Sequence, residues 1–323
     1  MKCLGYACIP SMIGSDKSDA STICVVGSAC VDLVFRSDRF PQPGETILGK
    51  SFTQSPGGKG ANQASAIARL GGASRYIGAV GQDAFGELMT RSLNEAGVDI
   101  NHMATLPHHP TGCAGIVVDA TGQNQIVVAP GANAAVSAKQ VIEALAPGGA
   151  ILAQLEVPLE AIKAAAKRGR LFLNPAPACA LPDEVYARSY AVLPNESEAE
   201  AITGVRPIDL PSCRSAALML LDRGVQHVVL TLGAAGCYWR SAQGDEGLFA
   251  PPAVAVVDTI GAGDAFCGAL VFFLIGAGHD WPTALNLANH AAALSTTRPG
   301  ALPALPSLAE LGKFAPHLFL NVH

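Results

Sequence analysis

The residues best suited to chemistry follow a glycine turn late in the chain, where Gly261, Ala262 and Gly263 precede Asp264 and an apolar stretch. Glycines at the first turn of a helix leave its free N–H groups open, and these groups attract an anion together with the helix dipole. Asp264 could serve there as a general base. It could equally be an ordinary first-turn acid that stabilises the helix terminus, and this segment alone favours neither interpretation.

A second glycine-rich turn, at residues 56–60, enters another predicted helix. Lys59 and Asn62 lie one helical turn apart, so a cation and an amide share one face at a helix N-terminus. Such a face suits a polyhydroxylated substrate. The alternative is a solvated start to a helix, which is less favoured because two rare features coincide at this turn.

A third polar segment, from Asn195 to Glu198, comes directly after a predicted buried strand. A carboxylate and an amide three residues apart can hold hydrated Mg2+ beside phosphate groups. The same pair is typical of an Asx-type helix cap, which is its commoner meaning. The segment therefore indicates either a magnesium site or the start of a helix.

The composition narrows the function classes. The 323 residues include 21 Lys and Arg against 26 Asp and Glu, a net charge of −5, so no basic field is available to hold nucleic acid. No stretch reaches the roughly 18–20 uncharged apolar residues of a membrane span, and residues 265–277 are interpreted as a buried helix. Nine scattered cysteines without a CxxC pair predict reduced thiols in the cytoplasm. We therefore expect neither nucleic acid nor a membrane as a partner.

The elements that must position these segments alternate regularly. From Ile23 onward, short β-branched runs alternate with helical patterns, which is typical of parallel strands joined by right-handed helical crossovers. The predicted fold class is α/β, with a doubly wound, mostly parallel central sheet flanked by helices. Strands are predicted at residues 23–27, 76–80, 151–154, 171–173, 191–193 and 228–230, and helices at 60–70, 84–96, 137–145, 158–167, 196–203, 211–223 and 307–314.

Two stretches, 31–55 and 112–128, break this rhythm, because they show strand-like alternation with turn residues and no pattern of helix length. They are predicted to pair as a small β-sheet lid over the carboxyl edge of the main sheet, where open α/β folds bind ligands. We expect a single domain over residues 22–323, preceded by a disordered N-terminal extension over residues 1–21.

In their order along the chain, these segments resemble the ribokinase-like (PfkB) family of sugar and nucleoside kinases over roughly residues 23–306. The resemblance extends to the shorter motifs Gly131-Ala132-Asn133, Gln154-Leu155-Glu156, Leu173-Asn174-Pro175-Ala176-Pro177-Ala178, Asn195-Glu196-Ser197-Glu198 and Thr231-Leu232-Gly233. It implies a ribokinase-like fold and an ATP-dependent sugar kinase that phosphorylates the 5-hydroxyl of D-ribose to give D-ribose 5-phosphate. Deoxyribose, fructose or a nucleoside is the alternative acceptor within the family.

Residue by residue, the resemblance implies that Asp264 is the general base and that the turn Gly261-Ala262-Gly263 forms the anion hole for the transferring phosphoryl group. The sugar would be bound by Cys30, Asp32, Gly57, Gly58, Lys59, Asn62, Glu156 and Asp264. ATP would lie along Asn195, Thr231, Gly233, Gly236, Gly263 and Asn289.

The resemblance also implies two cations and a partner. Mg2+ would accompany ATP through Asn195 and Glu198. A monovalent cation, K+, would lie beside the anion hole at Asp258, Ile260, Ser295, Arg298, Gly300 and Ala304. As in similar members of the family, a homodimer through the β lid is expected.

Two positions depart from the family's pattern. Cys30 stands where many members have an Asn that contacts the sugar, and a thiol hydrogen-bonds more weakly than an amide. This departure leaves the identity of the sugar open. Ala304 replaces a frequent Ser in the cation loop, so we expect a weaker dependence on K+.

Two other function classes compete with a kinase. An NAD-dependent oxidoreductase fits the alternation of strands and helices, but it requires a GxGxxG loop after the first strand, where the sequence is Gly27-Ser28-Ala29-Cys30-Val31-Asp32. A sugar sensor that has lost catalysis would be free to lose Asp264 or the glycines before it, and all are present. Phosphoryl transfer is therefore favoured.

Overall fold

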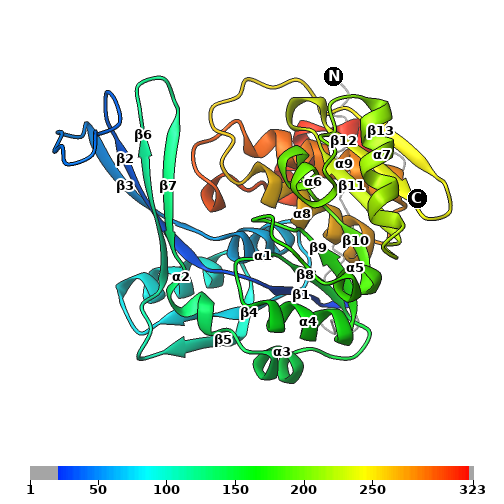
Figure 1. Ribbon diagram of the computed structural model, residues 1–323, viewed down its shortest axis with the longest axis horizontal. Coiled ribbons are helices and arrows are strands. Elements are labelled where there is room, and N and C mark those ends of the chain that lie inside the picture. The colour runs from blue at the N-terminus through cyan, green and yellow to red at the C-terminus, as the bar shows by residue number, and fades with distance from the viewer. Residues whose placement is uncertain (1–20, 320–323) are drawn as a thin grey trace, which may run out of the picture.

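The computed structural model describes residues 21–319 and builds them around a nine-stranded sheet with the order β13-β12-β11-β10-β9-β8-β1-β4-β5 (Figure 1). Neighbouring strands run parallel from β5 to β11, whereas β12 and β13 at the other edge are antiparallel. The strands are β1 (Ile23–Val26), β4 (Ser74–Gly81), β5 (Asp99–Leu106), β8 (Ala150–Ala153), β9 (Arg170–Leu173), β10 (Ser189–Val192), β11 (His227–Thr231), β12 (Cys237–Ser241) and β13 (Glu246–Phe249). The predicted α/β class with a mostly parallel sheet is confirmed.

Helices cover both faces of this sheet, because its inner strands carry apolar side chains on both sides. In β1, Ile23 and Val25 belong to the core under one group of helices, whereas Cys24 and Val26 belong to the core under the other. The first group is α1 (Lys59–Arg69), α2 (Ala84–Glu95), α8 (Ala262–Val271), α9 (Trp281–Ser295) and α10 (Leu308–Phe314). The second group is α3 (Ala138–Ala144), α4 (Leu159–Arg168), α5 (Asp183–Arg188), α6 (Glu196–Thr203) and α7 (Leu210–Leu221).

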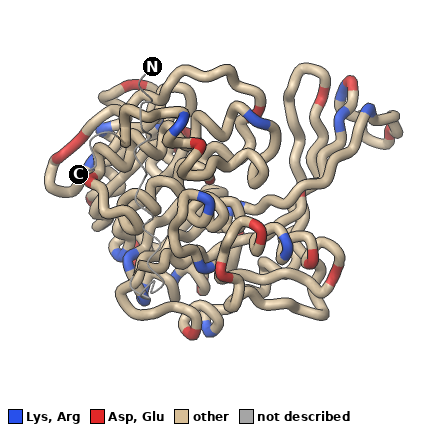
Figure 2. The backbone as a smooth tube through the Cα atoms, turned by 180° about the vertical axis from the view of Figure 1, so that it is seen from behind, with Lys and Arg blue, Asp and Glu red and all other residues tan. Residues whose placement is uncertain are grey.

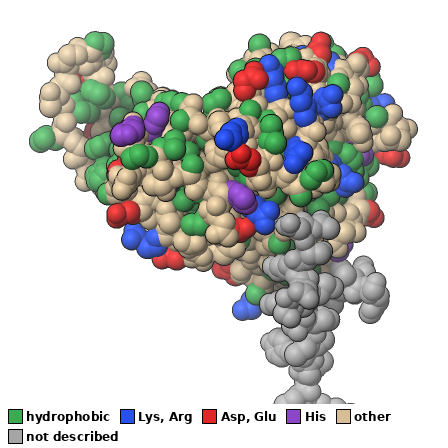
Figure 3. Space-filling model, turned by 90° about the horizontal axis from the view of Figure 1, so that it is seen from below, with side chains coloured by type: hydrophobic (Ala, Val, Ile, Leu, Met, Phe, Trp, Pro, Cys, Tyr) green, Lys and Arg blue, Asp and Glu red, His purple; other side chains and the backbone are tan. Residues whose placement is uncertain are grey.

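A second sheet, with the order β3-β2-β6-β7, projects from one side of this body (Figure 1). Its strands are β2 (Cys30–Arg36), β3 (Ser51–Gly57), β6 (Gly112–Val118) and β7 (Asn124–Ala129). Seen from below, the projecting sheet stands apart from the body and carries hydrophobic side chains (Figure 3). The two predicted lid segments therefore do pair as a separate small sheet, and we call it the lid sheet.

The sequence analysis did not predict five of the elements, which are β5, α5, α9, β12 and β13. The edge strand β5 carries polar residues such as Asp99 and Asn101, which hide its alternation, and α9 buries side chains around most of its circumference. The buried helix predicted at residues 265–277 is present as α8 and a π-helical turn at Phe272–Gly276. The predicted extension over residues 1–21 lies, apart from Ser21, outside the described residues.

Charged side chains are mixed over the surface. Seen from behind, Lys and Arg are interspersed with Asp and Glu (Figure 2). Several form ion pairs, such as Arg75 with Asp99 and Arg206 with Glu200. Between residues 21 and 319, no helix is both long and apolar enough to cross a membrane.

Candidate active site

Helix α8 begins at a turn that only glycine fits. Gly261 has a left-handed φ of 76°, and a Cβ there would lie 2.7 Å from the Cβ of Ala301. No side chain caps the helix, and the N–H of Ala262 donates back into the preceding turn. A Cβ added to Gly263 would meet no atom within 4 Å. Open space therefore lies beside Gly263 in the first turn of α8, where an anion site would need it.

Asp264, in the first turn of α8, is buried and held by two amides of α1. Asn62 Nδ2 donates to Oδ2 at 2.9 Å, and Gln63 Nε2 donates to Oδ1 at 2.8 Å. Burial raises the pKa of Asp264, while Lys59 and the two amides oppose this rise by stabilising the charged carboxylate. The result is a desolvated carboxylate with both oxygens oriented, which suits a general base.

The second glycine turn packs the start of α1 against the end of β1. Gly58 has a φ of 91°, and a Cβ there would lie 2.7 Å from the backbone nitrogen of Cys30. The N–H of Ala61 donates to the carbonyl of Ser28 at 2.9 Å. This close approach brings Lys59 to the base of the lid sheet, where β2 begins.

Four carboxyl groups surround one ammonium group at this base. Burial disfavours the charged form of Lys59, but the carboxylates outweigh this effect and raise its pKa, Asp264 contributing most and Glu156 next. Glu198 also favours the charged ammonium group. Burial raises the pKa of Asp32 to about 6, with a further rise caused by Glu156. Several negative charges thus compete for one cation in a site that excludes most water.

Cys30 and Asp32 project from the first residues of β2 and lie two positions apart, so they share one face of the lid sheet. Asn133 Nδ2 donates to Cys30 Sγ at 3.4 Å. Burial raises the pKa of Cys30 to about 12, so the thiol stays protonated at neutral pH. A Cβ on Gly57, which pairs with Cys30, would lie 2.4 Å from a carboxylate oxygen of Asp32, so glycine leaves the space for that carboxylate.

Asn195 and Thr231 lie side by side beyond β10 and at the end of β11, where they form an isolated bridge. Asn195 Oδ1 accepts from the N–H of Glu198, and Glu198 Oε2 accepts from the N–H of Asn195, both at 2.9 Å. The helix-cap interpretation is therefore correct, since this is a capping box of α6. Glu198 Oε1 takes no part in the box and is available to a hydrated cation.

Two further residues predicted to bind the nucleotide, Asn289 and Gly236, both lie against the backbone carbonyl of Phe249. Asn289 Nδ2, on α9, donates to the carbonyl of Phe249 at 2.8 Å. Gly236 has a φ of 89°, and a Cβ there would lie 2.0 Å from the same carbonyl oxygen. Gly233 begins the short turn that connects Thr231 to Gly236. The structure thus brings Asn289 and Gly236 together and links both to β11.

The residues predicted for a monovalent cation come from two segments that touch, residues 258–260 before α8 and residues 295–304 at and after the end of α9. Asp258 Oδ1 accepts from the N–H of Ile260 at 3.0 Å, and Oδ2 accepts from the N–H of Gly300 at 2.9 Å. The guanidinium of Arg298 pairs with Glu310 at 2.7 Å, so only its backbone is left for a cation. The other two residues of the set, Ser295 and Ala304, are buried. Backbone carbonyl groups in these loops fit a weakly hydrated cation.

Sequence reasoning assigned no role to several residues that form hydrogen bonds here. The Ser28 hydroxyl donates to Glu156, and Asn133 binds both the N–H and the carbonyl of Ala29 at 2.9 Å. Gln63 holds Asp264, as described above. A signal was present, since polar residues placed directly after buried parallel strands gather at the ligand-binding edge of the sheet. Gln154 and Asn174 come directly after β8 and β9, and Ser28 lies two residues after β1, whereas Asn133 and Gln63 do not follow this pattern.

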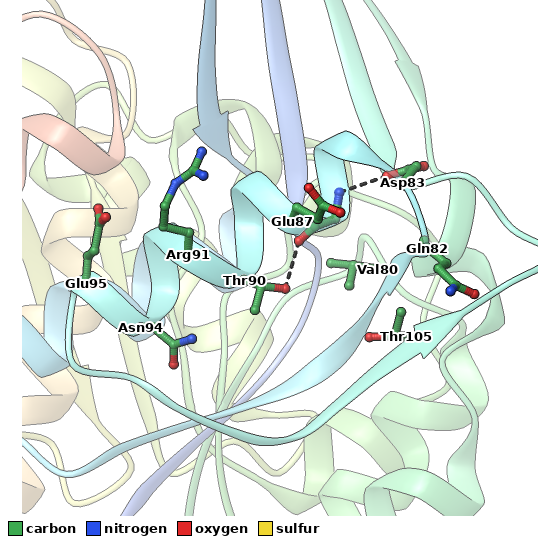
Figure 4. Close-up of a pocket in the computed structure, with 11 residues that line it drawn as sticks. Val80, Gln82, Asp83, Glu87, Thr90, Arg91, Asn94, Glu95 and Thr105 are labelled. Carbon is green, nitrogen blue, oxygen red and sulfur yellow. Dashed lines mark hydrogen bonds between the residues drawn. The ribbon is translucent and has the colours of Figure 1, made fainter.

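A pocket of about 530 Å3 lies elsewhere, against α2 and the ends of β4 and β5 (Figure 4). Glu87, Arg91 and Glu95 project from α2, and Thr105 lies on β5. None of the residues that line this pocket belongs to the predicted site. The pocket is therefore separate from the arrangement around Asp264.

A desolvated carboxylate beside an open helix N-terminus is the arrangement of an enzyme that deprotonates an alcohol and transfers an anionic group to it. The chain matches the pfkB family of carbohydrate kinases over residues 20–308, and it belongs to that family.

Individual relatives agree with this assignment. The ribokinase of Haemophilus influenzae is 37% identical over 304 residues, which cover 92% of this chain and 99% of the relative. The deoxyribokinase of Salmonella typhi is 35% identical over 303 residues, which cover 90% and 98%. A structure of Arabidopsis thaliana ribokinase complexed with ribose and ATP has a TM-score of 0.84 at 29% identity and covers 91% and 98%. The predicted fold and the predicted carbohydrate-kinase class are confirmed.

Proposed function

We propose that this protein transfers the γ-phosphoryl group of ATP to the 5-hydroxyl of D-ribose, giving D-ribose 5-phosphate and ADP. The observation that carries the proposal is Asp264, a buried carboxylate held by Asn62 and Gln63 at the open N-terminus of α8. Family membership and the similarity to ribokinases, one of them solved with ribose and ATP, support this choice of substrates.

Asp264 is the general base of the proposed reaction. The sugar oxygen attacks the γ-phosphorus and forms the new O–P bond, while the hydroxyl proton moves to the Asp264 carboxylate. The bond between the γ-phosphorus and the β-phosphate oxygen breaks, and ADP is released. The N–H groups of Gly263 and Asp264 at the start of α8 stabilise the charge on the transferring group. Because Asp264 is only 8% exposed, little bulk water competes for the base.

The sugar cradle combines donors with acceptors. Asn62 Nδ2 is held by Asp264, and among the described residues Asn62 Oδ1 is buried without a hydrogen-bond partner. Because buried polar atoms are almost always paired, this oxygen is available to accept from a sugar hydroxyl. The carboxylates of Asp32 and Glu156 accept from other hydroxyls, and the Lys59 ammonium donates. Such a set recognises vicinal hydroxyl groups.

Two cations complete the proposed site. Mg2+ bound with ATP neutralises phosphate charge, and Asn195 and Glu198 would reach it through water. K+ would be held by the loops that meet through Asp258 and Gly300, beside the first turn of α8. No group of three His, Cys, Asp or Glu side chains within residues 21–319 could hold a metal ion, so the proposed Mg2+ contacts run through water and phosphate.

We also propose a homodimer through the lid sheet. Phe35, Phe52, Ile126 and Val127 expose 46%, 53%, 53% and 77% of their surface on its strands. A small sheet with apolar side chains in water is a liability, and a second copy of the same sheet would cover it. A cytoplasmic location is part of the proposal, because an odd number of scattered cysteines is typical of a chain in a reducing compartment.

An assay of ATP consumption with ribose, deoxyribose, fructose and adenosine, in Mg2+ with and without K+, tests the proposal. We expect the highest kcat/KM with ribose, a higher rate with K+, and loss of turnover when Mg2+ is chelated. A higher kcat/KM with fructose or adenosine would overturn the assignment of ribose while leaving family membership untouched.

A further inference from the structure

Three buried amides connect Asp264 to the carboxyl ends of three neighbouring strands. Gln63 Nε2 donates both to Asp264 Oδ1 at 2.8 Å and to Asn174 Oδ1 at 3.1 Å. Gln154, directly after β8, donates through Nε2 to Gln63 Oε1. Asn174, directly after β9, donates through Nδ2 to the carbonyl of Leu193 beyond β10 at 3.0 Å. The carboxylate on α8 is thus tied, through one side chain of α1, to the rigid main sheet.

The groups at the two ends of this row of hydrogen-bonded amides determine which way each amide is turned. An ionised carboxylate and a backbone carbonyl can only accept hydrogen bonds, so Gln63 must present its NH2 group to Asp264, and Asn174 must present its NH2 group to Leu193. Gln63 Oε1 then faces Gln154 and accepts from its Nε2. No amide of the chain can be turned over without placing two donors or two acceptors face to face.

The two oxygens of Asp264 are therefore not equivalent. Oδ1 faces Gln63, which is fully buried, whereas Oδ2 faces Asn62, whose own Oδ1 is the unpaired acceptor of the sugar cradle. Each oxygen accepts one amide N–H and keeps a second acceptor position. Only Oδ2 adjoins Asn62, whose unpaired oxygen belongs to the sugar cradle, so Oδ2 lies on the side that the sugar would occupy.

We propose that Gln63 is a positioning residue, which fixes the rotation of the Asp264 carboxylate so that Oδ2 is the atom that takes the proton from the sugar hydroxyl. This inference rests on the proposed function, since it assigns an atom to the base of that reaction. Gln63 is fully buried and acts through Asp264.

The same contact sets the protonation of Asp264. A donor that binds the charged carboxylate favours it, so losing the Gln63 amide raises the pKa of Asp264. The other charged groups that act on Asp264 or on its immediate neighbours are Lys59, Glu156, Asp32 and Glu198. None of these groups is altered by a substitution at Gln63.

Two substitutions of similar size separate positioning from simple packing. Gln63→Met removes the donor, so we expect kcat to fall about tenfold to a hundredfold, a ribose KM within about threefold of the original, and an acid limb of kcat moved to higher pH. In Gln63→Glu a protonated Glu can donate to Asp264 as the amide does, but an ionised one repels it. We therefore expect this variant to be most active at low pH and to lose activity as pH rises.

Ser65→Ala is the matched control. Ser65 lies on the same helix, is fully buried, and has a hydroxyl without a partner among the described residues, so its removal breaks no contact to Asp264. We expect its kcat and pH profile to equal those of the original protein. Opposite pH shifts of Gln63→Met and Gln63→Glu support positioning. Two variants that lose only thermal stability, with unchanged pH profiles, would overturn it.

A readout that needs no turnover keeps this inference separate from the proposed function. The carboxyl pKa of Asp264, followed by isotope-edited infrared spectroscopy with Asp264→Asn to assign the band, should rise in Gln63→Met. If ribose is not phosphorylated but this pKa rises, the proposed substrate is wrong, while the role of Gln63 in orienting the carboxylate is supported. If ribose is phosphorylated and neither the pKa nor kcat changes, the inference falls alone. If Gln63→Met does not fold, Gln63→Glu alone tests the inference: loss of activity as pH rises supports it, and an unchanged pH profile contradicts it.

Discussion

The two sheets of this protein hold their functional side chains in opposite ways. At the carboxyl edge of the main sheet, Asp264 is enclosed and bound by two amides of α1, and one of them, Gln63, is itself anchored beyond β8, β9 and β10. Beyond its base, where Val31 joins the main core, the lid sheet buries only a small cluster, formed by Ala114, Ile116 and Val118, and leaves large apolar side chains in water. Asp32 and Cys30 stand where the lid joins the body.

This difference separates chemistry from recognition. A base must be held within a fraction of an ångström of its reacting proton, and a network anchored on several parallel strands supplies that rigidity. A sugar must enter and leave, so part of its cradle belongs to an element with little core of its own. We therefore expect substitutions in the network that anchors Asp264 to the main sheet to change kcat, and substitutions on the lid sheet to change KM and assembly.

Asp264→Asn gives the largest expected effect, because it keeps the shape of the side chain and removes its basicity. We expect kcat to fall by roughly a hundredfold to ten-thousandfold, while ATP affinity and thermal stability stay close to normal. Steady-state kinetics with ribose, nucleotide titration and a melting curve check this. If a well-folded Asp264→Asn protein kept its turnover, the acid would only stabilise the start of α8, at about 1 kcal/mol or less.

A double substitution in the lid sheet tests its proposed role in assembly. Ile126→Glu and Val127→Glu together place a charge on each face of the edge strand β7, because neighbouring residues of a strand point to opposite sides. If a second lid covers either face, dimerisation should weaken by about a hundredfold, or ~3 kcal/mol, since a buried unpaired charge is costly.

Analytical ultracentrifugation at micromolar concentration measures this effect, with the original protein expected as a dimer. Leu248→Glu is the control, because Leu248 is as exposed as Ile126, at 53%, but lies on β13 at the far edge of the main sheet. A monomeric original protein, or equal association of all three proteins, would contradict assembly through the lid.

The same contrast explains how much could be predicted from the sequence. The inner parallel strands were predictable because each is a short run of buried apolar residues, and the glycine turns at Gly58 and Gly261 were predictable because only glycine fits them. A helix cap at Asn195 was also one of the two interpretations of that segment, and the structure shows it as part of a capping box. These features depend on residues close together in the chain, so a local pattern contains them.

The amide chain around Gln63 could not be predicted in the same way. Its bonds join residues 91, 111 and 201 positions apart, and a single glutamine in a helix carries no local sign of a partner that far away. The antiparallel strands β12 and β13 were missed for a different reason, because β12 is buried on both faces and β13 has only four residues, so neither shows a clear alternation. The long-range pairing of polar groups had to come from the fold.

The pH dependence of ribose binding should follow Asp32. Its pKa of about 6 lies above the ordinary value of 3.8, mainly because it is buried, so it loses its charge as pH falls through 6. If only the ionised form accepts from the sugar, KM should rise about tenfold at pH 5, while the contribution of Asp264 appears in kcat. A KM profile for Asp32→Asn that is high and flat across this range identifies the group.

The raised pKa of Asp32 also makes the stability of the folded protein depend on pH. Between pH 3.8 and 6 the folded protein binds more protons at Asp32 than the unfolded chain, so stability is lost as pH rises through this window. Bound sugar reverses part of that loss, because its hydroxyls donate to the ionised carboxylate. A melting temperature that rises with added ribose more at pH 7 than at pH 5 agrees with this account, and an equal rise at both values contradicts it.

Cys30→Asn gives the smallest expected effect and tests the boundary between the two sheets. The thiol of Cys30 accepts a bond from Asn133 at 3.4 Å and stays protonated, so it is a weak partner for a hydroxyl. An amide at this position can accept from Asn133 through its oxygen and donate to the sugar through its nitrogen. We expect the ribose KM to fall by up to roughly tenfold, if one net hydrogen bond is regained, with kcat unchanged. Cys30→Ala should leave KM the same or raise it. An unchanged KM for Cys30→Asn would mean that position 30 does not touch the sugar. A changed kcat would mean that the lid strand also orients the reacting hydroxyl, so that sugar binding and catalysis are not divided between the two sheets.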